Sequence, residues 1–347
     1  MWTILKEKEG LGEDHKKKMS ELELTKPMNE LALFQERFNV HLKSIVGAQA
    51  SATSDDTENP SVLDNVNHAK EIILGPGKRI RPYISYLMYK SLGGQDDEEA
   101  LKLFAGIEIF HSFGLVHDDI IDNGKLRHGQ TTSHVYIANQ LKKENNRSGN
   151  LEKAGKNQAI IIGDLLSIWS QGVINLNEYF DPKKMQRIRK IFYQMAKQVA
   201  AGQMVDIDIT TRTNVPIEEI DEKTRLKTAG YSFIKPLQIG AALAGNETKE
   251  VEIFCKEFGL AMGIAFQVQD DLLDMTSSDD KLGKTTSSDK SQNQHTYFTY
   301  FPSLEYGKKI ISTNFEKARS LIKNLSIDES EKKKFFDLVE IIQNRTF

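Results

Sequence analysis

Apolar residues recur at three- and four-residue spacing over long stretches of this chain, and proline hardly interrupts them. The segment around Ile107, Phe110 and Val116 shows the pattern, and so does the segment around Ile188 and Met195. This spacing places apolar side chains on one face of an α-helix. Only 8 prolines occur in 347 residues, and alternating strands or hairpin turns are hard to find. The sequence therefore predicts an all-α protein.

The same pattern gives approximate bounds for the helices and loops. The predicted helices span 28–46, 61–74, 79–93, 97–122, 131–144, 156–178, 183–208, 217–244, 248–276, 303–324 and 328–343. Two segments, 51–60 and 142–156, are polar and poor in apolar residues, which predicts surface loops. Residues 277–295 are rich in Ser, Asp, Lys and Gly. They predict a loop that could close over a site.

The chain length is compatible with about two domains or with one large domain. No change in composition marks a boundary within the helical part, and the polar loops do not separate regions of different character. Residues 1–27 are highly charged and are expected to form an N-terminal arm. We therefore predict a single domain over 28–347.

Charge and cysteine content exclude several classes of protein. The 46 Lys and Arg residues nearly balance 49 Asp and Glu residues, which gives a net charge of −3. Such a chain has no overall basic field for nucleic acid or anionic lipid. The single cysteine, Cys255, excludes an intrachain disulfide and fits a reducing compartment. No apolar run approaches the roughly 18 residues of a membrane span. We therefore expect a cytoplasmic protein, and the balanced charge predicts that it has no nucleic-acid partner.

Two segments, 118–122 and 270–274, share the pattern Asp-Asp-x-x-Asp within apolar helical surroundings. Their aspartates are Asp118, Asp119, Asp122, Asp270, Asp271 and Asp274. The first and last aspartates of each segment lie one helical turn apart, and like charges at that spacing destabilise a helix. A bound cation reverses this effect. Because Mg²⁺ takes a few carboxylate oxygens and completes its shell with water and substrate phosphates, we predict a magnesium site rather than a solvated acidic face.

Basic residues occur where they could bind an anion. Lys78, Arg79 and Arg81 lie at a predicted helix start, where positive charge opposes the helix dipole. A bound anion explains them, and an ordinary solvated turn is the alternative. Further cations that follow the acidic segments or lie in apolar surroundings are Arg127, Lys227 and Lys284. Acids and bases together predict a diphosphate held between metal ions and cations.

The histidines are less informative. His111 lies seven residues before Asp118, and His117 directly precedes it. A histidine on an apolar helix is usually a core residue. The pair His117-Asp118 is also similar to metal-dependent phosphohydrolases, but that alternative requires further metal-binding histidines and leaves the second acidic segment unexplained. Cys255 is expected to pack in the core.

Taken together, the motifs resemble those of the trans-isoprenyl diphosphate synthases, or polyprenyl synthetases, from about residue 30 to the C-terminus. The shared motifs are G-K-R-x-R-P (77–82), H-D-D-x-x-D (117–122), R-x-G (127–129), G-D-x-L (163–166), G-Q-x-x-D (202–206), K-T (227–228), F-Q-x-x-D-D-x-x-D (266–274) and G-K (283–284). The resemblance implies one bundle of about ten core helices around a deep central cavity. It also implies a homodimer that binds three Mg²⁺ ions.

The resemblance further implies roles for individual residues. The direct Mg²⁺ ligands would be Asp118, Asp122 and Asp270, supported by Asp119, Asp271 and Asp274. The allylic diphosphate would be held by Arg127, Lys227 and Lys284, with Gln203, Asp206 and Gln267 nearby. The second diphosphate, isopentenyl diphosphate, would bind Lys78, Arg81 and His111, with Arg345 as a further candidate. The developing carbocation would be stabilised by Thr228 and Gln267.

Three features depart from the pattern of that family. His128 stands where a second arginine that helps to bind isopentenyl diphosphate is usual, so binding of this substrate is expected to be weaker or pH-dependent. Pro76 replaces the usual first glycine of the basic motif. The 139–157 loop is longer than in many relatives.

The resemblance implies a Mg²⁺-dependent prenyltransferase that condenses isopentenyl diphosphate head-to-tail with an allylic diphosphate. Phe113, five residues before Asp118, and the small Gly114 are similar to those of C20 producers. On a helix, Phe113 would lie about 7.5 Å below Asp118 and Phe110 about 12 Å below it. We therefore expect geranylgeranyl diphosphate as the main product, with farnesyl diphosphate next.

Two further alternatives concern other classes of protein. A class I terpene cyclase shares the helical fold, but it has a different second metal motif and does not need a basic site for a second diphosphate. A non-catalytic subunit of a prenyl synthase tends to lose acidic residues of the two motifs, whereas this chain keeps all of them.

Overall fold

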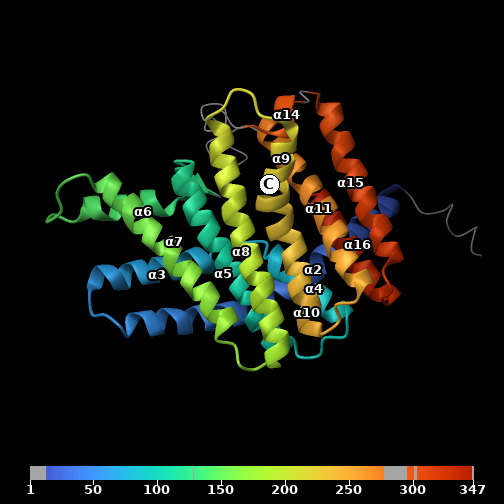
Figure 1. Cartoon of the computed structure of the whole chain (residues 1–347), viewed down its shortest axis with the longest axis horizontal. Coiled ribbons are helices and arrows are strands. Elements are labelled where there is room, and N and C mark those ends of the chain that lie inside the picture. The colour runs from blue at the N-terminus through green and yellow to red at the C-terminus, as the bar shows by residue number, and fades with distance from the viewer. Residues whose placement is uncertain (1–12, 128, 277–294, 301–302, 346–347) are drawn as a thin grey trace, which may run out of the picture.

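The computed structural model is built almost entirely of α-helices, which pack side by side in one bundle (Figure 1). It describes residues 13–127, 129–276, 295–300 and 303–345. The helices are α2 (Glu13–Ser54), α3 (Pro60–Leu74), α4 (Ile80–Ser91), α5 (Asp97–Ile121), α6 (Ser133–Lys143), α7 (Leu151–Asn175), α8 (Pro182–Thr210), α9 (Ile217–Lys223), η1 (Thr224–Ile234), α10 (Lys235–Ala244), α11 (Lys249–Thr276), α14 (Tyr297–Tyr300), α15 (Leu304–Asn324) and α16 (Glu329–Gln343). Within the described residues, the only sheet is the hairpin of β1 (Leu126–Arg127) and β2 (Gln130–Thr131). The predicted all-α class is confirmed.

Helix α5 lies among α2, α4 and α7 and is apolar on most of its surface. Phe104 and Ile107 are completely buried there. Asp96 caps its start by accepting a hydrogen bond from the Glu99 amide, and acidic residues in the first turn suit the helix dipole. Its end is marked by Asn123, whose φ of 50° ends the right-handed helix. The carboxylates of the first acidic segment therefore lie at the C-terminal end of a rigid central helix.

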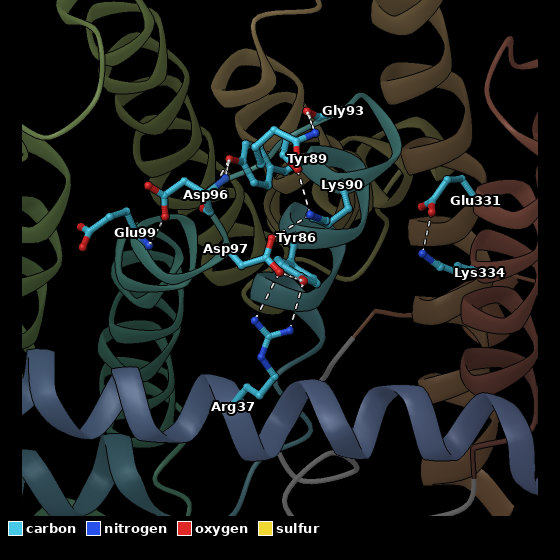
Figure 2. Close-up of polar contacts among 12 residues, drawn as sticks. Arg37, Tyr86, Tyr89, Lys90, Gly93, Asp96, Asp97, Glu99, Glu331 and Lys334 are labelled. Atoms are coloured by element: carbon cyan, nitrogen blue, oxygen red, sulfur yellow. Dashed lines mark hydrogen bonds and ion pairs between the residues drawn. The ribbon is translucent and has the colours of Figure 1, made fainter.

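A polar network ties the start of α5 to α2 and α4 (Figure 2). The Asp97 carboxylate accepts hydrogen bonds from Arg37 at 3.3 Å and from the Tyr86 hydroxyl at 2.9 Å. It also pairs with Lys90 Nζ at 2.8 Å. Burial and the bond to Asp97 raise the pKa of Tyr86 to about 12. These contacts fix the base of α5 and so the position of the carboxylates at its other end.

Two glycines allow η1 to lie close against its neighbours. A Cβ atom on Gly263 of α11 would lie 2.3 Å from the Ala229 Cβ, and one on Gly202 of α8 would lie 2.7 Å from the backbone nitrogen of Lys227. Side chains cannot be accommodated at such distances, so only glycine fits. Segment η1 is therefore held tightly by α8 and α11, and all three elements carry predicted site residues.

The prediction of one helix over 217–244 was wrong in its detail. The structure divides this stretch into α9, the π-helix η1 and α10. Apolar spacing does not reveal a change from i→i+4 to i→i+5 hydrogen bonding, and π-helical turns occur frequently at functional sites. Pro236, which has no backbone N–H, lies at the start of α10, where the pattern returns to α.

Other boundaries also differ from prediction. Residues 13–27, which the sequence places in the N-terminal arm, form the first part of α2; this part of the chain is rich in the good helix formers Glu, Leu and Lys. Residues 1–12 lie outside the described residues. Helix α7 begins at Leu151, so the second half of the predicted 142–156 loop is helical, capped by the Asn150 side chain. The β1–β2 hairpin was missed because two-residue strands are too short to show alternation.

Among the described residues, none of the helices combines the length and the apolar character needed to cross a bilayer. The central cavity, the domain bounds 28–347 and the lid function of residues 277–295 stay predictions. Residues 277–294 lie outside the described part of the chain.

Candidate active site

The first acidic segment lies at the C-terminal end of α5 and faces an arginine from β1. The buried Asp119 carboxylate accepts two hydrogen bonds from Arg127 Nε, at 2.8 and 3.0 Å, and pairs with its Nη2 at 2.7 Å. The same Nη2 lies 3.7 Å from Asp118. Burial raises the pKa of Asp119, against the opposing effect of Arg127. The β1–β2 hairpin, which the sequence did not reveal, therefore positions Arg127, a residue predicted to bind the diphosphate.

Lys227 bridges two carboxylates from different helices. Its Nζ lies 3.0 Å from Asp118 Oδ1 on α5 and 2.6 Å from Asp206 Oδ2 on α8. The other oxygen of Asp206 lies 3.2 Å from Lys223 Nζ. Burial alone lowers the pKa of Lys227, but Asp118 and Asp206 raise it on balance. The ammonium group thus remains charged at the centre of the site.

Asp122 directly follows α5 and has a strongly raised pKa. Burial and the nearby charge of Asp118 raise the pKa of Asp122 to about 7. A carboxylate whose charge is disfavoured by a neighbouring carboxylate forms a place where a cation is stabilising. Among the residues that the structure describes, no three carboxylate, imidazole or thiol groups form a ready-made metal cage. Mg²⁺ does not require one, because it commonly uses one or two carboxylates together with water and substrate phosphates, so this donor set fits Mg²⁺.

The second acidic segment is connected to the first through η1. The Gln267 amide donates to Asp271 Oδ1 at 2.8 Å, and the Thr228 hydroxyl donates to Gln267 Oε1 at 2.7 Å. Because Thr228 directly follows Lys227, adjacent residues of η1 reach both acidic segments. Asp274 lies on α11, and its side chain is outside the described part.

Arg81 of the basic segment also contacts η1. Arg81 Nη2 donates to the Ser232 hydroxyl at 2.9 Å, and its guanidinium lies 4.5 Å from the ring centroid of Tyr231. The Tyr231 hydroxyl is hydrogen-bonded to His111 Nδ1 at 2.7 Å. The structure therefore brings together Arg81 and His111, which are far apart in sequence.

Two more predicted cations lie beside the second segment. Arg345 pairs with Asp270 Oδ1 at 2.5 Å and stacks over the Phe266 ring, with its guanidinium carbon 3.6 Å from the ring centroid. Burial lowers the pKa of Lys78; Arg345 adds to this effect, and Asp270 opposes it. Lys78 therefore lies within electrostatic range of the same carboxylate as Arg345.

Some predicted residues are placed less fully. Gln203 lies on α8, half-buried and three residues before Asp206. His128 and Lys284 lie outside the described residues.

Sequence reasoning gave no role to Tyr231 and Lys223, which contact the site. Lys223 had a detectable signal, since it lies four residues before Lys227 and could share its face. Tyr231 had no signal of its own, because an aromatic residue in an apolar helical stretch is typical of the core.

Comparisons with known proteins point to one family. The polyprenyl synthetase family model matches residues 64–339. A short chain isoprenyl diphosphate synthase of Methanocaldococcus jannaschii is 33% identical over 66% of this chain and 63% of that protein. A geranylgeranyl diphosphate synthase of Sulfolobus acidocaldarius is 30% identical over 77% of this chain and 73% of its own length. The chain thus spans less than two thirds of the first of these relatives.

Solved structures show the same fold. A geranylgeranyl pyrophosphate synthase of Corynebacterium glutamicum, solved with isoprenyl diphosphate and magnesium, superposes with a TM-score of 0.81 and 24% identity, over 90% of this chain and 99% of that one. The family match covers most of the chain, including the described carboxylates and cations at the end of α5, on η1 and on α11. This chain belongs to the polyprenyl synthetase family.

Proposed function

We propose that this chain is a Mg²⁺-dependent prenyltransferase that joins isopentenyl diphosphate head-to-tail to an allylic diphosphate. The observation that carries the proposal is that adjacent residues of η1 link the two acidic segments: Lys227 contacts Asp118 directly, and Thr228 reaches Asp271 through Gln267. Relatives named geranylgeranyl and farnesyl diphosphate synthases support the reaction class.

Asp118, Asp122 and Asp270 would hold the metal, which we expect to comprise three Mg²⁺ ions. The remaining aspartates, Asp119, Asp271 and Asp274, support this shell. When bound, Mg²⁺ supplies positive charge to the departing diphosphate. In the structure, arginine and lysine side chains lie against Asp118 and Asp270, which marks both carboxylates as positions where positive charge is stabilised.

Lys227, Arg127 and Lys284 bind the allylic diphosphate and stabilise the negative charge that grows on it as the C–O bond breaks. Lys227 and Arg127 are held by carboxylates at 2.6 to 3.0 Å, so their charges are already oriented. Gln203 and Asp206 support them from α8. The Thr228 hydroxyl and the Gln267 amide oxygen stabilise the allylic carbocation.

Isopentenyl diphosphate binds Lys78, Arg81 and His111, with His128 in place of the usual arginine. Tyr231 holds Arg81 and His111 side by side. The double bond of isopentenyl diphosphate attacks the carbocation and forms the new carbon–carbon bond. The released diphosphate then takes the proton that restores the double bond, and the chain is longer by one five-carbon unit.

Substrate requirements distinguish this proposal from a terpene cyclase. The purified protein is incubated with an allylic diphosphate and Mg²⁺, with and without isopentenyl diphosphate, and hydrocarbon products are separated by chromatography. A synthase converts the allylic diphosphate to a longer prenyl product only when isopentenyl diphosphate is present. Cyclic hydrocarbons formed from the allylic diphosphate alone would contradict the proposal.

The proposed main product is geranylgeranyl diphosphate, because aromatic side chains lie below the first acidic segment. Phe113 packs against Phe110 with ring centroids 5.1 Å apart, and Phe110 contacts Phe192 and Tyr231. A Cβ atom on Gly114 would meet nothing within 4 Å. This open space lies next to an aromatic cluster, one to two helical turns below Asp118. The growing prenyl chain would extend into it until it meets the aromatic rings.

The Phe113→Ser variant is expected to give longer products, because the missing ring opens space below the site. Product length is measured by chromatography after removal of the diphosphate. Leu115→Ser is the matched control, since it removes a half-buried side chain from the same helix on another face. Unchanged product length in Phe113→Ser would exclude this residue as the limit.

The proposed active form is a homodimer that buries one face of α7 and α8, which lie next to each other (Figure 1). Ile161 and Ile168 on α7 are 66% and 62% exposed, and Tyr193 and Met204 on α8 are 65% and 70% exposed. Each pair lies on one face of its helix, and large exposed apolar side chains on neighbouring helices are typical of a protein interface. The proposed compartment is the cytoplasm, where the buried thiol of Cys255 stays reduced.

The Met204→Glu variant is expected to shift the protein from dimer to monomer, because it replaces the most exposed of these four apolar side chains with a charge. Size-exclusion chromatography with light scattering measures the change. Ile253→Glu on α11 is the control, with an apolar residue that is 50% exposed elsewhere. A dimer that persists in Met204→Glu would place the interface on another surface.

A further inference from the structure

Arg79, the middle cation of the basic segment, is directed into the protein. Its side chain is 6% exposed, and its Nη1 lies 2.8 Å from Glu108 Oε1 on α5, whose side chain is 5% exposed. The Arg79 Nε also donates to Asn39 Oδ1 on α2 at 3.1 Å. This cation is therefore neutralised internally, unlike an ordinary anion-binding arginine.

The turn before α4 is folded around this guanidinium. Arg79 Nη2 donates to the Gly75 carbonyl oxygen at 2.7 Å. A Cβ atom on Gly77 would lie 2.9 Å from Nη1, so glycine leaves room for the arginine there. The Arg79 backbone has a φ of 53°, a left-handed conformation that costs energy for a residue with a side chain. The buried contacts of Arg79 hold the turn in this conformation.

This turn and the start of α4 carry two of the proposed ligands of isopentenyl diphosphate. Lys78 and Arg81 flank Arg79, and the Lys78 carbonyl accepts a hydrogen bond from Gln35 at 2.8 Å. Glu108 lies three residues before His111, which is one turn along the same helix. The Arg79–Glu108 pair therefore links the turn with Lys78 and Arg81 to the helix that carries His111.

We propose that the buried Arg79–Glu108 ion pair is a positioning device that sets the spacing of Lys78, Arg81 and His111 around isopentenyl diphosphate. This inference rests on the proposed function, because it assumes that these three side chains bind that substrate. A buried ion pair is a weak source of stability, since apolar residues of similar volume often replace one without loss. Its contribution here is geometric.

The test separates geometry from stability with the double variant Arg79→Met/Glu108→Met, which removes both charges and fills the space with apolar atoms. Calorimetry measures the affinity for isopentenyl diphosphate, steady-state kinetics give KM for each substrate and kcat, and thermal unfolding gives Tm. Affinity for isopentenyl diphosphate is expected to fall by up to about 100-fold, with KM for the allylic substrate unchanged. Arg147→Met/Glu144→Met, an exposed pair with the same 2.8 Å separation, is the control.

The single variant Glu108→Gln keeps an acceptor of the same shape and is expected to retain more affinity than the double variant. If the double variant does not fold, Glu108→Gln is measured instead. It should lose affinity for isopentenyl diphosphate while KM for the allylic substrate stays unchanged. Wild-type affinity for isopentenyl diphosphate, or an equal loss for both substrates, would overturn the positioning role. A wild-type protein that neither binds isopentenyl diphosphate nor elongates any allylic primer would instead overturn the proposed function.

Discussion

Replacing either Asp118 or Asp270 by asparagine is expected to reduce turnover by at least about 10³-fold, equivalent to about 4 kcal/mol of transition-state stabilisation. Asparagine keeps the shape of the side chain but removes the charge that binds Mg²⁺. Both carboxylates are partly exposed, at 26% and 32%, so the fold is expected to survive. Turnover is measured with saturating substrates, and Mg²⁺ binding is measured separately by calorimetry.

Asp55→Asn is the matched control for these variants, because Asp55 is an exposed carboxylate in the turn after α2. It should leave turnover and Mg²⁺ binding at wild-type levels. Circular dichroism verifies that all three variants are folded. Near-normal turnover in folded Asp118→Asn or Asp270→Asn would show that the altered carboxylate does not hold the catalytic metal.

The second large effect is expected for Lys227→Met, which should lower kcat by about 10²–10³-fold. This variant removes the ammonium group that lies between Asp118 and Asp206. Without Lys227, the departing diphosphate lacks one stabilising positive charge, and the two carboxylates lose their shared counter-ion. Single-turnover kinetics measure the chemical step directly.

Two controls accompany Lys227→Met. Lys227→Arg keeps the charge and should recover part of the rate. Lys235→Met removes a buried lysine of the same helical stretch, whose Nζ contacts the amide oxygens of Gln194 and Gln238, and it should leave the rate unchanged. Equal losses in Lys227→Met and Lys235→Met would indicate a general structural effect and would remove Lys227 from the catalytic group.

The helical architecture was largely predictable because its determinant is local. Apolar spacing of three and four residues specifies helices such as α5 and α8, and Asp96 and Asn123 mark the ends of α5. The acidic segments were recognisable because like charges one turn apart within apolar surroundings have no structural benefit. The structure then shows that Lys227 and Thr228 connect them.

Features that depend on packing between distant segments were not predictable. The π-helix η1 has the same apolar pattern as an α-helix, and its position depends on Gly202 and Gly263 in two other helices. The internal role of Arg79 depends on Glu108, a residue 29 positions away, and neither residue shows this in the sequence. Charge patterns identify candidate site residues. Their burial and their contacts with other residues then show which of them line the site and which are directed into the protein.

The most direct test of the proposed function is elongation itself. Purified protein is incubated with Mg²⁺, isopentenyl diphosphate and each allylic diphosphate of five, ten and fifteen carbons, and the products are sized by chromatography beside an active synthase. We expect products that are longer by whole five-carbon units, that accumulate at twenty carbons, and that disappear when Mg²⁺ is chelated. No elongation of any primer, while the reference synthase is active, would contradict it.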